Sequence, residues 1–178
     1  MSSDQNVLRV ASRKSPLALI QVREVFELLE KTGARQPFEI LTFDTAGDRD
    51  QTTPLTLQPA DDFFTDTIDQ AVMAGVADIG IHSAKDIPQK LPQGLKIFAL
   101  TPALDETDAW VSRYSFAELP AGSSVGTSSL LRQEMIHSTR ADLKCVDIRG
   151  TIQERIKLVE ENKIQGIIVA TCALKRLK

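Results

Sequence analysis

The sequence predicts an α/β fold of two lobes around a cleft, with mixed but mostly parallel sheets. Short apolar runs of strand length alternate with longer segments of helical periodicity, which is typical of parallel βαβ units with right-handed crossovers. The stretch 101–107, which carries Pro102, interrupts this series, and a new α/β series follows it. We therefore expect one α/β domain over residues 1–101 and a second over residues 102–178.

The first domain is expected to contain strands over 7–12, 38–43, 76–81 and 94–100. A helix should begin at Pro16, because serine is a favoured N-cap and proline a favoured first helical residue, and Ser15 precedes Pro16. This helix should end near residues 31–33, and another is expected over 63–73. The polar stretch 44–62 is too long for an ordinary connection, so we expect a functional or mobile loop there. The predicted apolar faces of the two helices are Leu17, Ile20, Val25, Leu28 and Leu29 in the first, and Phe64, Ile68 and Val72 in the second.

The second domain continues the alternation. Strands are expected over 109–112, 124–126, 143–148 and 166–170, and helices over 128–138, 151–161 and from residue 172 onward. Each predicted helix follows a strand, as in a parallel βαβ series.

Composition and charge narrow the class of protein. The chain is 42% hydrophobic and 25% charged with a net charge of −3, which indicates a globular protein and gives no reason to expect nucleic acid or an anionic membrane as a partner. No apolar run approaches the roughly 20 residues that span a bilayer, and the polar N-terminus lacks a signal-peptide core, so we expect a cytoplasmic protein. Cys145 and Cys172 have no metal-ligand spacing, so neither a metal site nor a disulfide framework is expected.

A polar turn, residues 82–86, follows the predicted strand 76–81. Asp86 lies there beside Lys85 and near Ser83. In open α/β sheets the carboxyl ends of strands face the ligand crevice, so this carboxylate is well placed for chemistry. The residues alone leave a second interpretation open, in which Asp86 only ends the strand and hydrogen-bonds within its own turn.

Basic and hydroxyl-bearing residues follow three other predicted strands. One group surrounds Arg13 and Ser15 at a helix N-terminus, where free N–H groups favour an anion. The second is the segment 126–133, a hydroxyl-rich turn followed by a helix with Arg132 one turn in, and the third is Arg149 with Arg155 one turn later. Each alone could be a helix cap or a surface charge. Together they favour a small ligand with several carboxylates, because arginine suits bidentate carboxylate binding.

Several ordered motifs resemble one family, porphobilinogen deaminase (hydroxymethylbilane synthase), over essentially the whole chain. They are the segments 8–18 (LRVASRKSPLA), 82–88 (HSAKDIP), 119–122 (LPAG), 126–130 (GTSSL), 148–150 (IRG) and 173–177 (ALKRL). The resemblance implies a fold like the type II periplasmic binding proteins with a small third domain. It implies a transferase of porphyrin and heme biosynthesis that joins four porphobilinogen units, with loss of ammonia, into a linear tetrapyrrole.

The resemblance also implies roles for individual residues. Asp86 matches the catalytic aspartate, with Lys85 beside it. Positions that bind the acetate and propionate groups of substrate and cofactor are matched by Arg9, Arg13, Ser15, Ser83, Thr127, Ser129, Arg132, Arg149, Arg155 and Arg176. The cofactor of the family is a dipyrromethane, linked by a thioether to a cysteine of the third domain.

The chain departs from the family pattern at several positions. It ends at Lys178, so the third domain and its cysteine are expected to be absent, and neither Cys145 nor Cys172 matches that cysteine. Covalent attachment of dipyrromethane is therefore not expected. Two loop lysines of the family are replaced by Leu57 and Asp61, and one of two paired arginines is replaced by Leu131.

Two other classes of function stay open beside the transferase. One is a catalytically silent member or fragment that binds a small polycarboxylate or pyrrole without turnover. The other, an effector-binding module on the same fold, would need a DNA-binding partner domain. The leading expectation is a monomer that acts on porphobilinogen.

Overall fold

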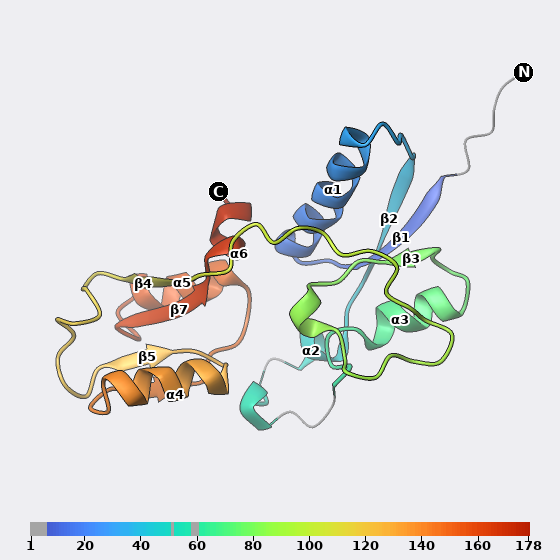
Figure 1. Cartoon of the computed structure of the whole chain (residues 1–178). Helices are drawn as coiled ribbons and strands as arrows, with labels where there is room; N and C mark the ends of the chain where they lie inside the picture. The colour runs from blue at the N-terminus through green and yellow to red at the C-terminus, as the bar shows by residue number, and fades with distance from the viewer. Residues whose placement is uncertain (1–6, 51, 58–60) are drawn as a thin grey trace, which may run out of the picture. The chain divides into compact units, whose positions relative to one another are not determined.

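The computed structural model describes residues 7–50, 52–57 and 61–178, and these residues divide into two compact units. Unit 1 takes in the chain up to Asp50, the stretch that ends at Pro102, and Leu177. Unit 2 takes in Ala103–Arg176, the short segment 52–57 and Lys178. Figure 1 shows the elements of each unit along the chain.

Unit 1 is built on a three-stranded parallel sheet in the order β2-β1-β3. β1 is Leu8–Arg13, β2 is Phe38–Phe43 and β3 is Ile79–Gly80. The helices are α1 (Pro16–Lys31), α2 (Ala46–Arg49) and α3 (Asp66–Met73), and a short 3₁₀ turn, η2, covers Ala84–Asp86. Because all three strands run in the same direction, the loops that follow them gather at one edge of the sheet.

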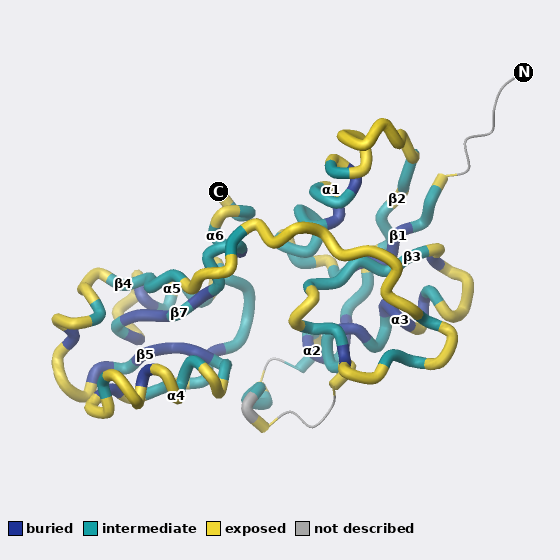
Figure 2. Tube along the Cα trace, in the orientation of Figure 1, coloured by how far each residue is buried: buried dark blue, intermediate teal, exposed yellow. Residues whose placement is uncertain are grey.

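The two faces of this sheet are covered by different helices. Val10 of β1 packs with Val22 and Phe26 of α1, whereas its neighbour Ala11 packs with Ile68 and Ala71 of α3. Successive residues of a strand point to opposite faces, so α1 and α3 lie on opposite sides of β1. Figure 2 shows the buried residues of β1 between them.

Unit 2 is built on a four-stranded sheet in the order β4-β7-β5-β6. β5 pairs in parallel with β6 and with β7, while β4 is antiparallel to β7. The strands are β4 (Asp108–Ser112), β5 (Ser124–Gly126), β6 (Lys144–Val146) and β7 (Gly166–Ala170). The helices are α4 (Leu130–Thr139), α5 (Ile152–Glu160) and α6 (Thr171–Arg176), and the segment 52–57 adds the 3₁₀ turn η1 (Leu55–Leu57).

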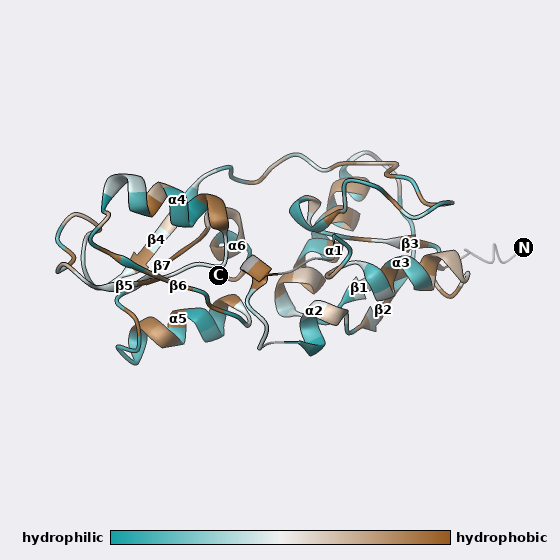
Figure 3. Cartoon of the chain, turned by 90° about the horizontal axis from the view of Figure 1, so that it is seen from below, coloured by the Kyte–Doolittle hydropathy of each residue, from teal (hydrophilic) through white to brown (hydrophobic). Residues whose placement is uncertain are grey.

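The sheet of unit 2 is also covered on both faces. Ile167 and Val169 of β7 pack with Val159 of α5, whereas Val125 of β5 packs with Ile136 of α4. Figure 3 shows α4 and α5 on either side of the strands. At the β4–β7 pair, Trp110 lies so close to the chain that a Cβ on Gly166 would be 2.1 Å from its ring. Glycine at 166 therefore leaves the space that the indole fills.

The predicted α/β fold with mixed, mostly parallel sheets is confirmed, and three of the predicted strands have the observed bounds. The strand expected over 94–100 is wrong, because this segment forms no strand. Phe98 and Leu100 are 71% and 73% exposed, so the apolar run has no neighbour to pair with or pack against. The strand expected over 76–81 is reduced to two residues, with Val76 exposed.

The apolar face predicted for the first helix is shifted. Val22 and Phe26 are its buried residues, while Leu29 is exposed and the other predicted members are half-buried. The predicted long loop 44–62 contains α2 and η1, and its residues 51 and 58–60 lie outside the described part of the chain. Within the described ranges, no helix is long and apolar enough to cross a membrane.

Candidate functional site

The turn that carries Asp86 follows β3 directly. Asp86 closes the short turn η2, and its backbone N–H donates to the carbonyl oxygen of Ser83 at 2.9 Å. The carboxylate is largely withdrawn from solvent, with 13% of its side chain exposed, while the neighbouring Lys85 is 80% exposed. Lys85 Nζ lies 3.3 Å from Asp86 Oδ1, so a cation accompanies this carboxylate at the carboxyl edge of the sheet.

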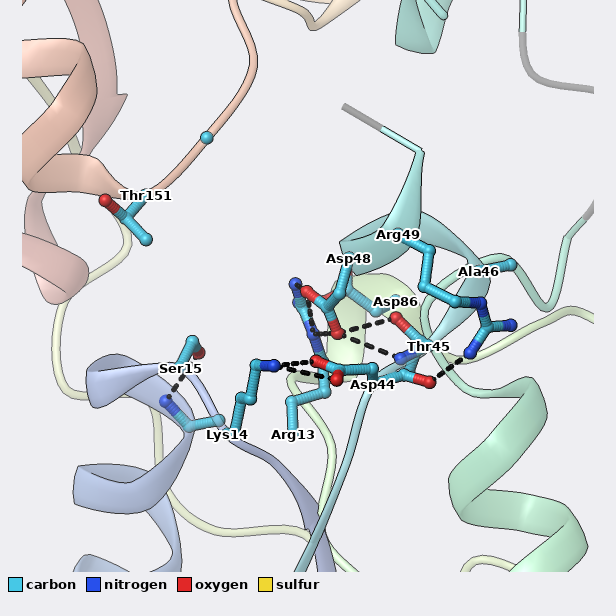
Figure 4. A network of polar contacts seen from close by, with 12 residues as sticks. Arg13, Lys14, Ser15, Asp44, Thr45, Ala46, Asp48, Arg49, Asp86 and Thr151 are labelled. Carbon is cyan, nitrogen blue, oxygen red and sulfur yellow. Dashed lines mark hydrogen bonds and ion pairs between the residues drawn. The ribbon is translucent and has the colours of Figure 1, made fainter. Parts of the chain in front are cut away.

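Arg13 ends β1 at the same edge and is already bound to a carboxylate. Its Nε lies 3.1 and 3.0 Å from the two carboxylate oxygens of Asp48, and its Nη2 also contacts Oδ1. The guanidinium carbon stacks 4.7 Å from the ring centre of Phe64. Figure 4 shows Arg13 and Asp48 turned toward each other. The guanidinium of Arg13 is therefore stacked on the Phe64 ring and paired with both oxygens of a carboxylate. The same bidentate geometry suits a ligand carboxylate.

Asp48 is fixed by the local structure of α2. Thr45 is the N-cap, and Asp48 accepts hydrogen bonds from both the backbone N–H of Thr45 at 3.1 Å and its hydroxyl at 2.8 Å. Burial alone would raise the pKa of Asp48, but hydrogen bonds from Arg13 and Thr45 outweigh it and leave the pKa below its ordinary value. Asp48 is therefore held as an anion against Arg13.

Lys14 and Ser15 complete this edge. Lys14 Nζ binds Asp44 at 2.7 Å, and both side chains are substantially exposed. Ser15 is the N-cap of α1, and its Oγ accepts from the N–H of Ala18 at 3.3 Å. Arg13 thus has Asp48 of α2 as its partner, and Lys14 has Asp44 of the β2–α2 loop.

Arg9 is not brought to this edge. It is the second residue of β1, about 13 Å along the strand from Arg13 at the usual rise per residue. Its Nε and Nη2 bind the two carboxylate oxygens of Asp78 at 3.1 and 2.7 Å. This pair raises the pKa of Arg9 and lowers that of Asp78. The contact joins the starts of β1 and β3, and a ligand-binding role for Arg9 stays a prediction.

In unit 2, the hydroxyl turn after β5 is ordered by its own hydrogen bonds. Thr127 is 1% exposed, and its Oγ1 accepts from the N–H of Ser129 at 3.3 Å. Ser129 is the N-cap of α4 and accepts from the N–H of Arg132 at 3.4 Å. Between them, Ser128 Oγ donates to Asp147 Oδ1 at 2.6 Å and accepts from the N–H of Ile148. The turn is thereby tied to the segment that follows β6.

Three arginines and one aspartate interact electrostatically near the turn after β5 and the segment after β6. We call Arg132, Arg149, Arg155 and Asp147 the arginine cluster. Burial and then the charge of Arg149 lower the pKa of Arg155, Asp147 opposes this, and Arg132 lowers it further. Nη1 of Arg149 is buried, and Nε of Arg155 donates to the carbonyl oxygen of Gly150 at 3.0 Å. Three arginines gathered in this way favour an anionic ligand, because guanidinium groups suit carboxylates.

Two other predicted residues have clear positions. Arg132 is held by Asp108 of β4, with Nε–Oδ2 and Nη2–Oδ1 distances of 2.8 and 2.5 Å. Arg176 is the last residue of α6 and is half-buried. Its place among ligand-binding residues stays a prediction. The described part of the chain holds no group of three or more histidine, cysteine or acidic side chains arranged for a metal ion.

Comparison with known proteins gives the family. The family model "Porphobilinogen deaminase, dipyromethane cofactor binding domain" matches residues 8–178. The chain belongs to the porphobilinogen deaminase family. It is 38% identical over 173 residues to the porphobilinogen deaminase of Geobacter sulfurreducens, covering 97% of this chain and 54% of that protein. It is 40% identical over 172 residues to the probable porphobilinogen deaminase of Chlamydia muridarum, covering 96% of this chain and 70% of that protein.

The chain spans about half the length of the Geobacter relative. Among solved structures, the periplasmic VFT2 domain of Bordetella pertussis BvgS has a TM-score of 0.49 at 15% identity, over 94% of this chain and 68% of that one. The resemblance to the porphobilinogen deaminase family, first drawn from the motifs, is thus confirmed by the family model and the relatives.

Three positions where the chain differs from the expected porphobilinogen deaminase pattern are on the surface. Leu57 is 70% and Leu131 67% exposed, and Asp61 is exposed as well. Residues 58–60 of the same loop lie outside the described part of the chain. None of the three side chains is in a core, so packing does not require the residue found at any of these positions.

The cysteines occupy ordinary structural positions. Cys145 is in β6 and Cys172 in α6, and both are free and half-buried. Burial raises the pKa of the Cys145 thiol, which makes it a poorer nucleophile at neutral pH. Attachment of a cofactor to either cysteine is not settled by these positions.

Sequence reasoning missed the acidic partners of the predicted cations and the ring beneath Arg13. Asp48 carried a detectable signal, because Thr45 and Asp48 have the spacing of a capping box. Asp78 and Asp108 carried none, since they are distant in sequence from Arg9 and Arg132. Phe64 was assigned to a helix face, but it precedes α3 and packs under Arg13.

Proposed function

We propose that this chain carries the ligand-binding and acid–base residues of a hydroxymethylbilane synthase. The reaction joins porphobilinogen units stepwise, and each unit loses ammonia, to give a linear tetrapyrrole for heme and porphyrin biosynthesis. The proposal extends the reaction of the family to this chain, which spans about half the length of the Geobacter relative. The substrate is porphobilinogen, which carries one acetate and one propionate group.

The arginine cluster is the observation that carries the proposal. Arg155 is half-buried beside Arg149 and near Arg132, and burial together with these like charges lowers its pKa. Bringing like charges together away from water is costly unless an anion offsets it. Asp147 and Glu154 oppose this effect on Arg155, and Asp108 pairs with Arg132, so the nearby acids offset part of the positive charge. A pyrrole with two carboxylates has the complementary charge.

Asp86 supplies the second requirement of the reaction. Loss of ammonia leaves a positively charged pyrrole species, which a carboxylate withdrawn from water stabilises strongly. Asp86 is withdrawn in this way, since 13% of its side chain is exposed, and Lys85 Nζ lies 3.3 Å from its Oδ1. An Asp86 oxygen would also accept a hydrogen bond from a pyrrole N–H as the positive charge develops.

The residues fit a dipyrromethane cofactor by the chemistry of their donors. Arg132, Arg149 and Arg155 would bind its carboxylates, with the Thr127 and Ser129 hydroxyls as further partners. When bound, a dipyrromethane supplies the pyrrole carbon to which the first substrate unit is joined. We propose that this chain holds it without a thioether, because neither cysteine matches the family's cofactor cysteine.

A catalytically silent binding protein is the second candidate. Specific observations favour it: Leu57, Asp61 and Leu131 are exposed at positions where the family pattern has cations. Three positive charges are thus replaced by two neutral side chains and one negative one. At about 1.5–3 kcal/mol for each charge-assisted hydrogen bond, the loss would weaken retention of a polyanion by orders of magnitude.

Intact mass and turnover separate the two candidates. An added mass equal to dipyrromethane on the purified chain would contradict non-covalent retention. Porphobilinogen consumption by the wild type that is lost in Asp86→Asn, and kept in Asp142→Asn on the surface, supports the synthase. Binding of porphobilinogen without consumption in either form supports the silent binder. Absence of binding overturns both.

The same proposal includes the physical state of the protein. We propose a cytoplasmic monomer that binds no nucleic acid, as composition and charge led us to expect. Sedimentation at several concentrations tests the oligomeric state, and a concentration-dependent rise in mass would contradict it.

A further inference from the structure

His82 and Asp69 form a close polar contact, largely shielded from solvent, that the roles above do not use. His82 Nε2 lies 3.2 Å from Asp69 Oδ1, and only 12% and 10% of the two side chains are exposed. His82 follows β3 by two residues, and Asp69 lies in the middle of α3. The pair therefore joins the start of the Asp86 turn to a helix packed on the sheet.

The sheet leaves room for this contact at Gly80. A Cβ on Gly80 would lie 3.1 Å from His82 Nε2 and 3.0 Å from Cγ2 of Ile68, which is fully buried. Both distances are shorter than ordinary carbon contacts. Glycine at the end of β3 thus allows the imidazole to lie against α3, next to the core.

The next residue is fastened to the opposite face. The Ser83 hydroxyl donates to Gln21 Oε1 of α1 at 3.1 Å. Since α1 and α3 cover opposite sides of the sheet, His82 and Ser83 tie the turn to both layers. Asp86 depends on these two ties, because its N–H is bound to the carbonyl oxygen of Ser83.

We propose that His82 and Asp69 are positioning residues, which hold the turn 83–86 so that the Asp86 carboxylate keeps one orientation. Only the purpose of that orientation rests on the proposed function. A polar contact between an imidazole nitrogen and a carboxylate is stronger when water is excluded, so this pair can restrain the backbone that follows it. Without it, Ser83 alone would anchor the turn.

The test compares four variants of the full chain by NMR and by porphobilinogen binding. His82→Leu removes the ring nitrogen, whereas His82→Gln can place an N–H near Asp69. Asp69→Asn keeps an acceptor oxygen but removes the charge. The chain has two histidines, so His137→Gln, at an exposed position of α4, is the matched control.

We expect His82→Leu to shift the amide resonances of residues 83–86 and to weaken porphobilinogen binding roughly tenfold. His82→Gln should restore most of both effects, and His137→Gln should produce neither. Asp69→Asn should shift the same amide resonances in the same direction and also move the imidazole ring resonances of His82.

A purely structural pair would give a different pattern. In that case His82→Leu would lower thermal stability while the resonances of 83–86 and the affinity stay unchanged, as expected for a core variant such as Phe26→Leu. That result overturns the proposal. If His82→Leu does not fold, the amide resonances of residues 83–86 in Asp69→Asn provide the same test of the proposal. If the wild type fails to bind porphobilinogen while the resonances respond, positioning stands and the proposed function fails.

Discussion

Arg13 holds both carboxylate oxygens of Asp48, with Nε at 3.1 and 3.0 Å, at the end of the central strand of unit 1. A predicted ligand-binding arginine thus has an internal carboxylate in the place where a ligand carboxylate would pair with it. The side chains are 25% and 17% exposed, so water weakens this pair less than an ion pair on the surface.

Asp48→Asn tests the contribution of this pair to stability. We expect a loss of about 1.5–3 kcal/mol in the free energy of unfolding at pH 7, because a charge-assisted hydrogen bond is lost. Since the pKa of Asp48 is lowered in the folded state, its contribution is full above the unfolded pKa of about 3.9. It declines as the pH falls toward the folded pKa, so the two proteins should converge in acid.

Circular dichroism in urea at several pH values measures this difference. The exposed Glu27→Gln is the control and should show no such pH-dependent gap. Trp110 and Tyr114 are the chain's single tryptophan and tyrosine, and both lie in unit 2. Trp110 fluorescence should therefore stay unchanged, and a gap that does not narrow as the pH falls would contradict the role of the Asp48 charge.

Gly47→Ala tests how Phe64 reaches Arg13. A Cβ on Gly47 would lie 2.2 Å from Phe64 Cε1, so the ring must move away from its place 4.7 Å from Arg13. We expect a loss of about 1–3 kcal/mol from overpacking, measured by circular dichroism. The double variant Gly47→Ala with Phe64→Leu should recover part of it, because the smaller side chain leaves space. Equal stability of the single variant and wild type would refute the close approach.

Arg155→Met separates binding from folding. Because burial and neighbouring arginines already disfavour its charge, loss of Arg155 should leave the urea midpoint of unit 2, followed by Trp110 fluorescence, unchanged or higher. Binding of porphobilinogen should weaken about tenfold or more by calorimetry. Arg35→Met, at a side chain that is 90% exposed, should change neither. A lower midpoint with unchanged affinity would assign Arg155 a structural role instead.

Leu131→Arg tests whether a lost cation limits ligand binding. Leu131 is 67% exposed, so the change should alter stability by less than about 0.5 kcal/mol. It should raise affinity for porphobilinogen by roughly tenfold, the value of one charge-assisted hydrogen bond. Met135→Arg adds the same charge one turn later on α4, at a side chain that is 58% exposed, and serves as control. Equal gains from both variants would mean a general charge effect.

The sequence predicted the order of strands and helices better than where each of them begins and ends. Alternating apolar runs and the Ser15–Pro16 start identified β1 and α1 because those signals are local. Residues 94–100 show the opposite case, since an apolar run becomes a strand only where a neighbour can pair with it. The structure leaves Ile97, Phe98 and Leu100 exposed, which no periodicity could have shown.

For the site, the cations were predictable and their partners were not. Arg13 and Arg132 lie in short motifs that follow strands, so the sequence placed Arg13 at a strand end and Arg132 in the first turn of the next helix. Asp48 and Asp108 are 35 and 24 residues away in the chain and come near only through the sheet. The same distance in sequence hid the pairing of Arg9 with Asp78, which keeps that arginine at the other end of β1.

The bidentate pair of Arg13 also means that ligand binding at this arginine would exchange one carboxylate for another. A ligand carboxylate that reaches Arg13 must replace Asp48, so one anion leaves the guanidinium as another arrives. The number of paired charges there is unchanged by the exchange, and added salt should have little effect on it. The fraction of Arg13 bound to ligand would then depend on which carboxylate pairs better with the guanidinium. A ligand carboxylate must bind Arg13 more favourably than Asp48 does.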